Sequence, residues 1–207
     1  LPGFIDSHTH VCHYGNRSDE YAKRNSGISY QQILAEGGGI HNTMNSTSNC
    51  TDDQLRDNTL KRLKRHFLEG VLTCEVKSGY APSLEDEIRM LKIINKIDSD
   101  NEIDLIPTCL AAHVTPKSFG SSKQYLESII NELLPKIKEE NLSKRVDIFI
   151  EEKAFSVSEA SHFLKHVKND FSITAHANQF TSGGLRVGVD YGAVSVDHLE
   201  VITDDEI

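Results

Sequence analysis

Short apolar runs alternate with longer amphipathic segments along most of the chain. Each run has the length of a buried strand, and the runs occupy residues 4–7, 71–76, 105–111, 146–150, 173–175 and 193–196. The segments between them have apolar residues at helical spacing, and they occupy residues 52–69, 83–97, 123–140, 158–168 and a stretch after Gly184. Repeated strand–helix units of this kind predict an α/β protein with a parallel sheet.

Capping residues set several of the expected helix limits. Thr51 predicts the N-terminal cap of the first long helix, and Gly70 predicts its end. Ser83 predicts the start of the next helix. A short helix is expected at 30–36, just before a run of glycines, within an otherwise polar segment that shows no clear periodicity. Thr203, which acidic residues follow, predicts one more helix start.

Polar and ionisable side chains follow each expected strand at its carboxyl end. These residues are His8, His10, Lys77, Ser78, Tyr80, His113, Glu151, Glu152, His176 and His198. In a doubly wound sheet only the strands beside the switch point would contribute to one site, whereas every strand of a (β/α)8 barrel ends at the same mouth. The pattern therefore favours a TIM-type (β/α)8 barrel. About six units are visible where a barrel needs eight, so we expect a barrel truncated at both ends.

Two histidines separated by one residue follow the first strand. Residues i and i+2 of a strand point to the same face, about 7 Å apart, so His8 and His10 can aim at one point. With His176 they offer three nitrogen ligands, the number that a catalytic zinc takes beside an open position for water. His113 and His198 remain at the same rim as hydrogen-bond donors or proton carriers. The alternative for any one of them is a core histidine bonded to a backbone carbonyl.

Composition limits the classes of partner. The chain has 207 residues, 38% of them hydrophobic, which suits a single core, and its formal net charge is −9. This charge argues against nucleic acid or an anionic membrane as a partner, and no apolar run is long enough to span a bilayer. The cysteines at 12, 50, 74 and 109 lack CxxC spacing, so neither a zinc knuckle nor a disulfide framework is expected. A reducing cytoplasm is the simplest location.

Six sequence motifs together resemble the imidazolonepropionase family of the amidohydrolase superfamily. They are PGFIDSHTH at 2–10 with Arg17, AEGGGI at 35–40, EVKSGY at 75–80, AAH at 111–113, HANQ at 176–179 and VDHLE at 196–200. The HxH pair alone would indicate only the superfamily, whereas the KSGY and GGG segments are more particular to the family. The resemblance covers essentially the whole chain.

The resemblance implies a hydrolase of histidine metabolism, which opens the ring of 4-imidazolone-5-propanoate to give N-formimidoyl-L-glutamate. Members hold one zinc or iron ion in a distorted metal-dependent hydrolase barrel, beside a small β-sandwich made from both chain ends. We therefore expect residues 1–207 to form a partial barrel domain without the last two βα units and the sandwich. The expected partner is a small-molecule substrate with a carboxylate, without nucleic acid or membrane, and a homodimer is left open.

Functional residues carry over where the motifs match. The implied metal ligands are His8, His10 and His176. The implied substrate-binding residues are Arg17, Tyr80, His113 and Gln179. His198 matches a catalytic histidine beside the attacking water. The fourth ligand of the family, an aspartate after the eighth strand that also acts as general base, is expected beyond Ile207.

Several positions depart from the resemblance or leave a choice open. Ala81 stands where glycine is expected and Asn178 where aspartate is expected, which puts the local loop geometry in doubt. Gln179 occupies a position that is glutamate in some members and glutamine in others. Lys77 is interpreted either as a ligand-binding cation or as the ion-pair partner of a glutamate after the fourth strand.

Two other function classes remain open. A cytosine- or guanine-type deaminase shares the HxH pair and His176, but it needs a carboxylate at the position of Gln179 to move protons to the ring. A non-catalytic relative would bind metal for structure or assembly. Arg17 argues against this last class, because an arginine fork suits the propionate of a substrate.

Overall fold

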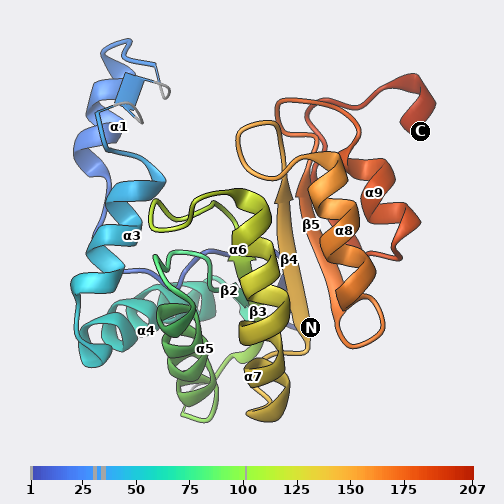
Figure 1. Cartoon of the computed structure of the whole chain (residues 1–207). Helices are drawn as coiled ribbons and strands as arrows, with labels where there is room; N and C mark the ends of the chain where they lie inside the picture. The colour runs from blue at the N-terminus through green and yellow to red at the C-terminus, as the bar shows by residue number, and fades with distance from the viewer. Residues whose placement is uncertain (1, 30–31, 34–35, 101) are drawn as a thin grey trace.

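The sheet is parallel throughout, and its strands follow one another in chain order. The computed structural model describes residues 2–29, 32–33, 36–100 and 102–207. Within this part of the chain, six strands form one sheet that curls into a half-barrel (Figure 1). They are β1 (Phe4–Asp6), β2 (Val71–Lys77), β3 (Asp104–Ala112), β4 (Arg145–Ile150), β5 (Ser172–Ala177) and β6 (Ser195–His198). The predicted α/β class is confirmed.

Helices connect the strands and pack against one face of the sheet (Figure 1). The α-helices of the described residues are α1 (Ser18–Asn25), α3 (Ile40–Asn49), α4 (Asp52–Leu68), α5 (Leu84–Asp98), α6 (Ser122–Ser128), α7 (Leu134–Glu139), α8 (Val157–Val167) and α9 (Gly184–Asp190). A π-helical turn at Ile129–Leu133 joins α6 to α7, and a 3-10 helix spans Asp204–Glu206. Helix α4 contacts β2, α5 contacts β3, α8 contacts β4 and α9 contacts β5. Because neighbouring strands pair in parallel, their carboxyl ends lie on one common edge.

Local sequence accounts for the helix limits. Thr51 and Gln54 form a capping box at the start of α4, in which Gln54 N–H donates to Thr51 Oγ1 over 3.2 Å. Ser83 caps α5 through the N–H of Asp86. Gly70 has a φ of +92°, a left-handed conformation that glycine adopts without strain, and it separates α4 from β2. The caps predicted at Thr51 and Ser83 are confirmed.

All six predicted strands are present, with limits that differ from the expected ones by at most two residues. The helix expected at 123–140 is interrupted by the π-helical turn, and Thr203 precedes a 3-10 helix. Sequence periodicity gave no sign of α1 or α3, and the short helix expected at 30–36 lies largely outside the described residues. Helix α1 could not be predicted because it has no buried residue and therefore no apolar stripe.

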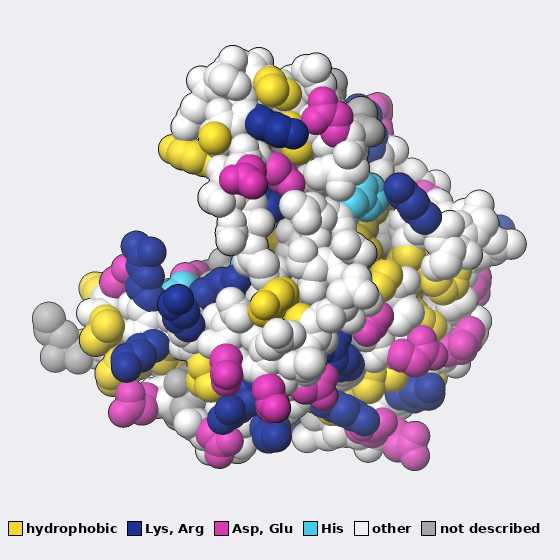
Figure 2. All heavy atoms as spheres, turned by 90° about the vertical axis from the view of Figure 1, so that its left-hand side faces the viewer, with side chains coloured by type: hydrophobic (Ala, Val, Ile, Leu, Met, Phe, Trp, Pro, Cys, Tyr) yellow, Lys and Arg dark blue, Asp and Glu magenta, His cyan; other side chains and the backbone are white. Residues whose placement is uncertain are grey.

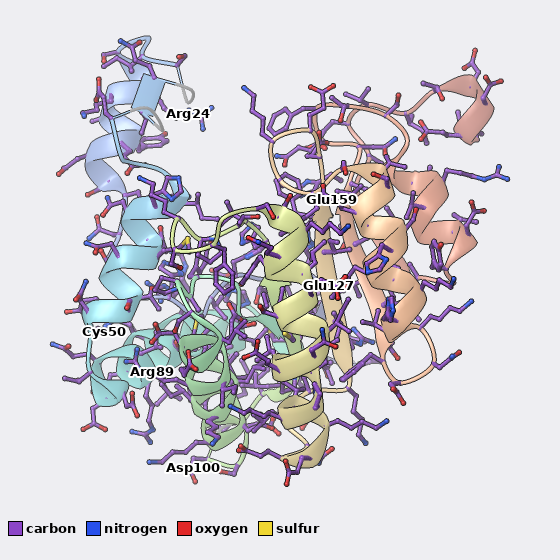
Figure 3. The ribbon with its side chains drawn as sticks, in the orientation of Figure 1. Arg24, Cys50, Arg89, Asp100, Glu127 and Glu159 are labelled. Carbon is purple, nitrogen blue, oxygen red and sulfur yellow. The ribbon has the colours of Figure 1, made fainter. Side chains whose placement is uncertain are left out.

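The two helices of this polar segment project beside the sheet and are held by polar contacts (Figure 1). Glu20 on α1 accepts the N–H of Gly39, at the start of α3, over 3.0 Å. At the other end of α3, Arg89 on α5 donates to the carbonyl of Cys50 over 2.6 Å and to Asp52 Oδ1 over 2.6 Å (Figure 3). Charge-assisted bonds of this kind supplement the limited burial of the segment, since α1 buries no residue and Met44 is the buried apolar residue of α3.

The apolar core lies between the sheet and its helices. Ile148 on β4, Ile94 on α5 and Phe163 on α8 are completely buried there. The edge strand β1, by contrast, exposes 69% of Phe4 and 72% of Ile5. In the part of the chain that the structure describes, no helix has the length and apolar character needed to cross a membrane.

Candidate metal centre

Five histidines from four strands meet at the carboxyl edge of the sheet. Their common neighbour is His176 on β5. Measured between ring centroids, His176 lies 4.6 Å from His8, 5.2 Å from His10, 5.3 Å from His198 and 5.9 Å from His113. The structure thus brings together every histidine that the sequence placed at a strand end.

The ring nitrogens form two overlapping groups that share His176. His10 Nε2 lies 3.1 Å from His176 Nε2. One ring nitrogen each of His8, His176 and His198 lie within 4.8 Å of one another, close enough to hold one ion. The first group contains two of the predicted ligands. The second group contains His198, for which the motif resemblance implies a catalytic role.

Two carboxylates fix the proton positions of the central imidazoles. His176 Nδ1 lies 2.9 Å from Asp147 Oδ1, and His8 Nδ1 lies 2.9 Å from Asp197 Oδ2. Burial opposes ionisation of Asp147, but the charges and hydrogen bonds of His176 and Lys77 outweigh it and lower its pKa. An ionised carboxylate can only accept, so each Nδ1 donates. The Nε2 lone pairs of His8 and His176 are therefore available to an ion.

His10 supplies an independent test of whether the residues fit a metal. Burial, and after it the neighbouring His113, His176 and His8, lowers its pKa, so the ring is neutral. Its Nδ1 is buried and has no hydrogen-bond partner. His10 Nε2 lies 3.1 Å from His176 Nε2. A proton on His10 Nε2 makes this contact a hydrogen bond to His176, whereas a proton on Nδ1 leaves two facing lone pairs that a shared cation would stabilise. Neutral imidazoles with converging lone pairs suit zinc, iron and related divalent ions.

His113 and Tyr80 form the wall of the cluster on the side of β2 and β3. His113 stacks on His10 at 5.4 Å, and the Tyr80 ring lies 5.8 Å from His113 and 5.9 Å from His10. His113 Nδ1 donates to the carbonyl of Gly79 over 3.1 Å. Burial, followed by the charge of His176, lowers its pKa to about 4, so His113 is neutral near pH 7. Two of the four predicted substrate-binding residues, Tyr80 and His113, therefore lie at the metal-site histidines.

Arg17 and Gln179 lie nearer the periphery. Arg17 is exposed and immediately precedes α1. Burial lowers the pKa of His13 to about 4, with Arg62 and Arg17 contributing, and the His13 ring packs against Tyr80 at 5.7 Å. Gln179 follows β5, and its backbone N–H donates to Glu151 Oε1 over 2.9 Å. His13 thus lies beside the cluster through Tyr80, a position that the sequence pattern did not reveal.

The ion pair proposed for Lys77 with a glutamate after β4 is wrong. Lys77 is fully buried, and its Nζ lies 2.6 Å from Glu75 Oε1 and 2.6 Å from Asp147 Oδ2. Glu151 instead accepts the backbone N–H groups of residues 179–181 in the loop after β5, and Glu152 is exposed. Lys77 is therefore occupied inside the sheet and does not face a ligand as a free cation.

Asp147 and Asp197 are functional candidates that sequence reasoning overlooked. Asp147 is the one charged side chain within the buried stretch of β4, and Asp197 immediately precedes His198 on β6. A lone carboxylate inside a buried strand is itself a signal, because an isolated charge is costly there without a partner.

The departure at Asn178 has a structural explanation. Asn178 has a φ of +56°, a conformation that asparagine tolerates better than most residues. Its Nδ2 donates to the carbonyl of Val201 over 2.8 Å and to Glu206, while its Oδ1 accepts the N–H of Leu185 over 2.9 Å. An aspartate could not donate to Val201. The amide thus ties the loop after β5 to the segment after β6.

Among the residues that the structure describes, no other surface shows a comparable concentration of metal-ligating groups. Figure 2 shows the face formed by the helices before β2, where basic and acidic side chains are interspersed. A groove between α4 and α5, lined by residues that include Asp52, Arg56 and Lys92, contains none of the predicted site residues. The candidate site is therefore the histidine cluster.

These features define the class: a parallel α/β half-barrel with a candidate metal site of histidines at the carboxyl edge of its strands. The chain is similar over its whole length to curated imidazolonepropionases. It is 44% identical to that of Caldanaerobacter subterraneus subsp. tengcongensis, 43% to that of Thermoanaerobacter pseudethanolicus and 42% to that of Streptococcus gordonii. It covers 51%, 51% and 50% of these relatives, so it spans about half of their length. The resemblance predicted from the motifs is confirmed.

The other comparisons add little. No protein-family model matches the chain. Among solved structures, a cobalamin-binding protein from Desulfitobacterium hafniense covers 88% of this chain and 93% of its own, with 12% identity and a TM-score of 0.28. A similarity of that size supports no statement about fold or function.

Proposed function

We propose that this protein is an imidazolonepropionase: a metal-dependent hydrolase that opens the ring of 4-imidazolone-5-propanoate to give N-formimidoyl-L-glutamate in histidine degradation. The observation that carries the proposal is the convergence of five strand-end histidines in a chain that matches imidazolonepropionases from end to end. The relatives named above all have this activity in their names, so the comparisons do not favour a deaminase.

His8, His10 and His176 are proposed to hold one zinc or iron ion. When bound, such an ion acts as a Lewis acid that activates water near neutral pH. The contribution of the chain itself is to keep these imidazoles neutral and correctly oriented. Asp197 and Asp147 do so for His8 and His176 by accepting the Nδ1 protons.

The substrate is proposed to lie between the histidines and the α1 side of the site. Arg17 would receive the propionate, because its planar fork matches a carboxylate bidentately. Tyr80 and His113 would contact the imidazolone ring, since both rings lie within 6 Å of His10. Gln179 would add a hydrogen bond to the same ring. The formal net charge of these 207 residues is −9, which repels an anionic substrate at long range, so a local cation such as Arg17 would favour its binding.

Proton transfer needs a base toward the attacking water and an acid toward the departing nitrogen. His198, partly exposed and 3.5 Å from Glu200, would hold that water and stabilise developing charge. Gln179 has no titratable proton and cannot act in this way. The general base is proposed to be the family's aspartate after the eighth strand.

The half-barrel is proposed to form part of a (β/α)8 amidohydrolase domain that also carries the small β-sandwich. The exposed apolar residues of β1 support this, because an uncovered edge strand normally pairs with another strand. We propose a cytoplasmic location, which the four free and buried cysteines support.

The test uses the purified intact protein with 4-imidazolone-5-propanoate, and mass spectrometry of the product. Formation of N-formimidoyl-L-glutamate, abolished by a chelator and restored by zinc or iron, is expected. His176→Asn should abolish turnover, whereas the matched change His162→Asn on the exposed face of α8 should not. Release of ammonia from cytosine or guanine without ring opening of the imidazolone would overturn the proposal in favour of a deaminase.

A further inference from the structure

A fully buried chain of charged groups ends at His176. Lys77 Nζ lies between Glu75 Oε1 and Asp147 Oδ2, 2.6 Å from each. Asp147 Oδ2 also accepts from Thr174 Oγ1 over 2.8 Å, while its other oxygen accepts from His176 Nδ1 over 2.9 Å. None of these side chains is more than 5% exposed. These groups are therefore shielded from bulk solvent, and an unpaired charge among them would be costly.

The geometry assigns a separate task to each oxygen of Asp147. Oδ2 is held by two donors, Lys77 and Thr174, so the carboxylate cannot rotate without losing both bonds. Oδ1 is consequently fixed toward His176. The network contains two carboxyl groups against one ammonium, and Glu75 Oε2 has no partner. This surplus of negative charge lies behind the imidazole and would stabilise a cation in front of it.

We propose that Asp147 and Lys77 are positioning residues: they hold His176 in the tautomer that binds a cation and thereby set the metal affinity of the site. The inference rests on the proposed metal site and goes beyond its ligands. Lys77 has no hydrogen bond to a proposed ligand, and its contact with His176 runs through Asp147.

The substitution Asp147→Asn separates this role from simple packing. An amide has one acceptor atom and one donor group in place of two acceptors. The ammonium of Lys77 can only donate, so the amide oxygen turns toward it and the amide nitrogen faces His176 Nδ1. That Nδ1 must then accept, which moves the imidazole proton to Nε2 and removes the lone pair offered to the ion. Lys77 keeps Glu75 as its counter-ion, so no buried charge is left unpaired.

The experiment measures Zn²⁺ affinity of the intact metal-free protein by competition with a chromophoric chelator, and the His176 tautomer by ¹⁵N NMR. Asp147→Asn should weaken Zn²⁺ binding roughly 10–100-fold and shift the proton of His176 from Nδ1 to Nε2. The control is Glu127→Gln on α6 (Figure 3), where the same chemical change is made beside the exposed His162, 2.8 Å away. It should leave both quantities unchanged.

A compensating variant tests the part of Lys77. In the triple change Glu75→Gln, Lys77→Met and Asp147→Asn, no ammonium competes for the amide oxygen, which can turn to His176 again. Zn²⁺ affinity should recover at least tenfold over Asp147→Asn alone. Equal affinities in the single and triple variants would remove Lys77 from the proposal.

Two outcomes would overturn the whole inference. In the first, NMR finds the proton of His176 on Nε2 in the metal-free wild type; this result can be obtained even if Asp147→Asn does not fold. In the second, folded Asp147→Asn protein binds Zn²⁺ as tightly as the wild type. Ring opening is assayed on the same samples. Altered metal affinity without ring opening in the wild type would refute the proposed function alone, and ring opening with unaltered affinity would refute this inference alone.

Discussion

The buried carboxyl of Glu87 should make the free energy of unfolding depend on pH. This carboxyl lies on α5 and is 1% exposed. One oxygen accepts the N–H of Gly79 over 2.9 Å, and the other is buried without a hydrogen-bond partner. Burial raises the pKa of Glu87 to about 7, against which its hydrogen bonds act only partly. We predict that Glu87→Gln stabilises the protein near neutral pH.

The sign and size follow from proton linkage. The folded protein holds the Glu87 proton up to about pH 7, whereas the unfolded chain releases it near pH 4.5. Between these values the unfolded state binds fewer protons, so the free energy of unfolding falls as the pH rises. At about 1.4 kcal/mol for each pH unit, the loss reaches about 3 kcal/mol near pH 7 and changes little at higher pH. Glutamine keeps an acceptor for Gly79 and does not titrate.

The assay is urea denaturation of wild type and variant at several pH values between about 4 and 8. The difference in unfolding free energy, variant minus wild type, should increase by about 3 kcal/mol across this range, because contributions of other groups cancel. Glu85→Gln, an exposed position on the same helix, should give a difference that stays within about 0.5 kcal/mol. If the difference in unfolding free energy between Glu87→Gln and wild type did not change with pH, Glu87 would not retain its proton in the folded state.

The remaining predictions concern the proposed reaction in the intact protein. Arg17→Lys keeps the charge but loses the planar fork of the guanidinium, so KM should rise about 10-fold or more. Replacing the propionate of the substrate with a neutral amide should then raise KM more in the wild type than in the variant. Equal increases would show that Arg17 does not hold the carboxylate. His198→Asn should lower kcat ~10²-fold or more with metal retained on elemental analysis, whereas loss of the metal would make His198 a ligand. Gln179→Ala should act mainly on KM. A Gln179→Glu variant with sharply raised kcat and a shifted pH profile would show that proton transfer can occur at this position.

The inner strands β4 and β5 could be predicted from sequence because most of their residues are buried, which leaves a continuous apolar run. The order of polar residues after these runs was also sufficient to predict that the histidines gather, since parallel strands end at one edge. Helices α1 and α3 could not be predicted in this way. They depend on contacts such as Glu20 with Gly39 and Arg89 with Cys50, which join residues distant in sequence.

The partners of the buried charges show a second limit. The i and i+2 rule places Glu75 and Lys77 on the same face of β2, so their pairing was within reach of sequence reasoning. Asp147 was not, because β3 lies between β2 and β4 and only the curl of the sheet brings the two side chains within 2.6 Å. The position of Lys77 on β2 could be predicted from sequence, whereas its pairing with Asp147 depends on the curvature of the sheet.

The structure also sharpens the question of which histidines bind the ion. His176, held by Asp147, belongs to both nitrogen groups, so the choice lies between His10 and His198 as its companion beside His8. His10 is neutral, and its Nε2 lies only 3.1 Å from His176 Nε2, so both nitrogens could bind one ion. His198 is partly exposed and lies 3.5 Å from Glu200, which suits a side chain that exchanges protons with its surroundings. If both were ligands, the five imidazoles could hold a second ion, and the metal content measured for His198→Asn would fall to a fraction of the wild-type value and not to zero.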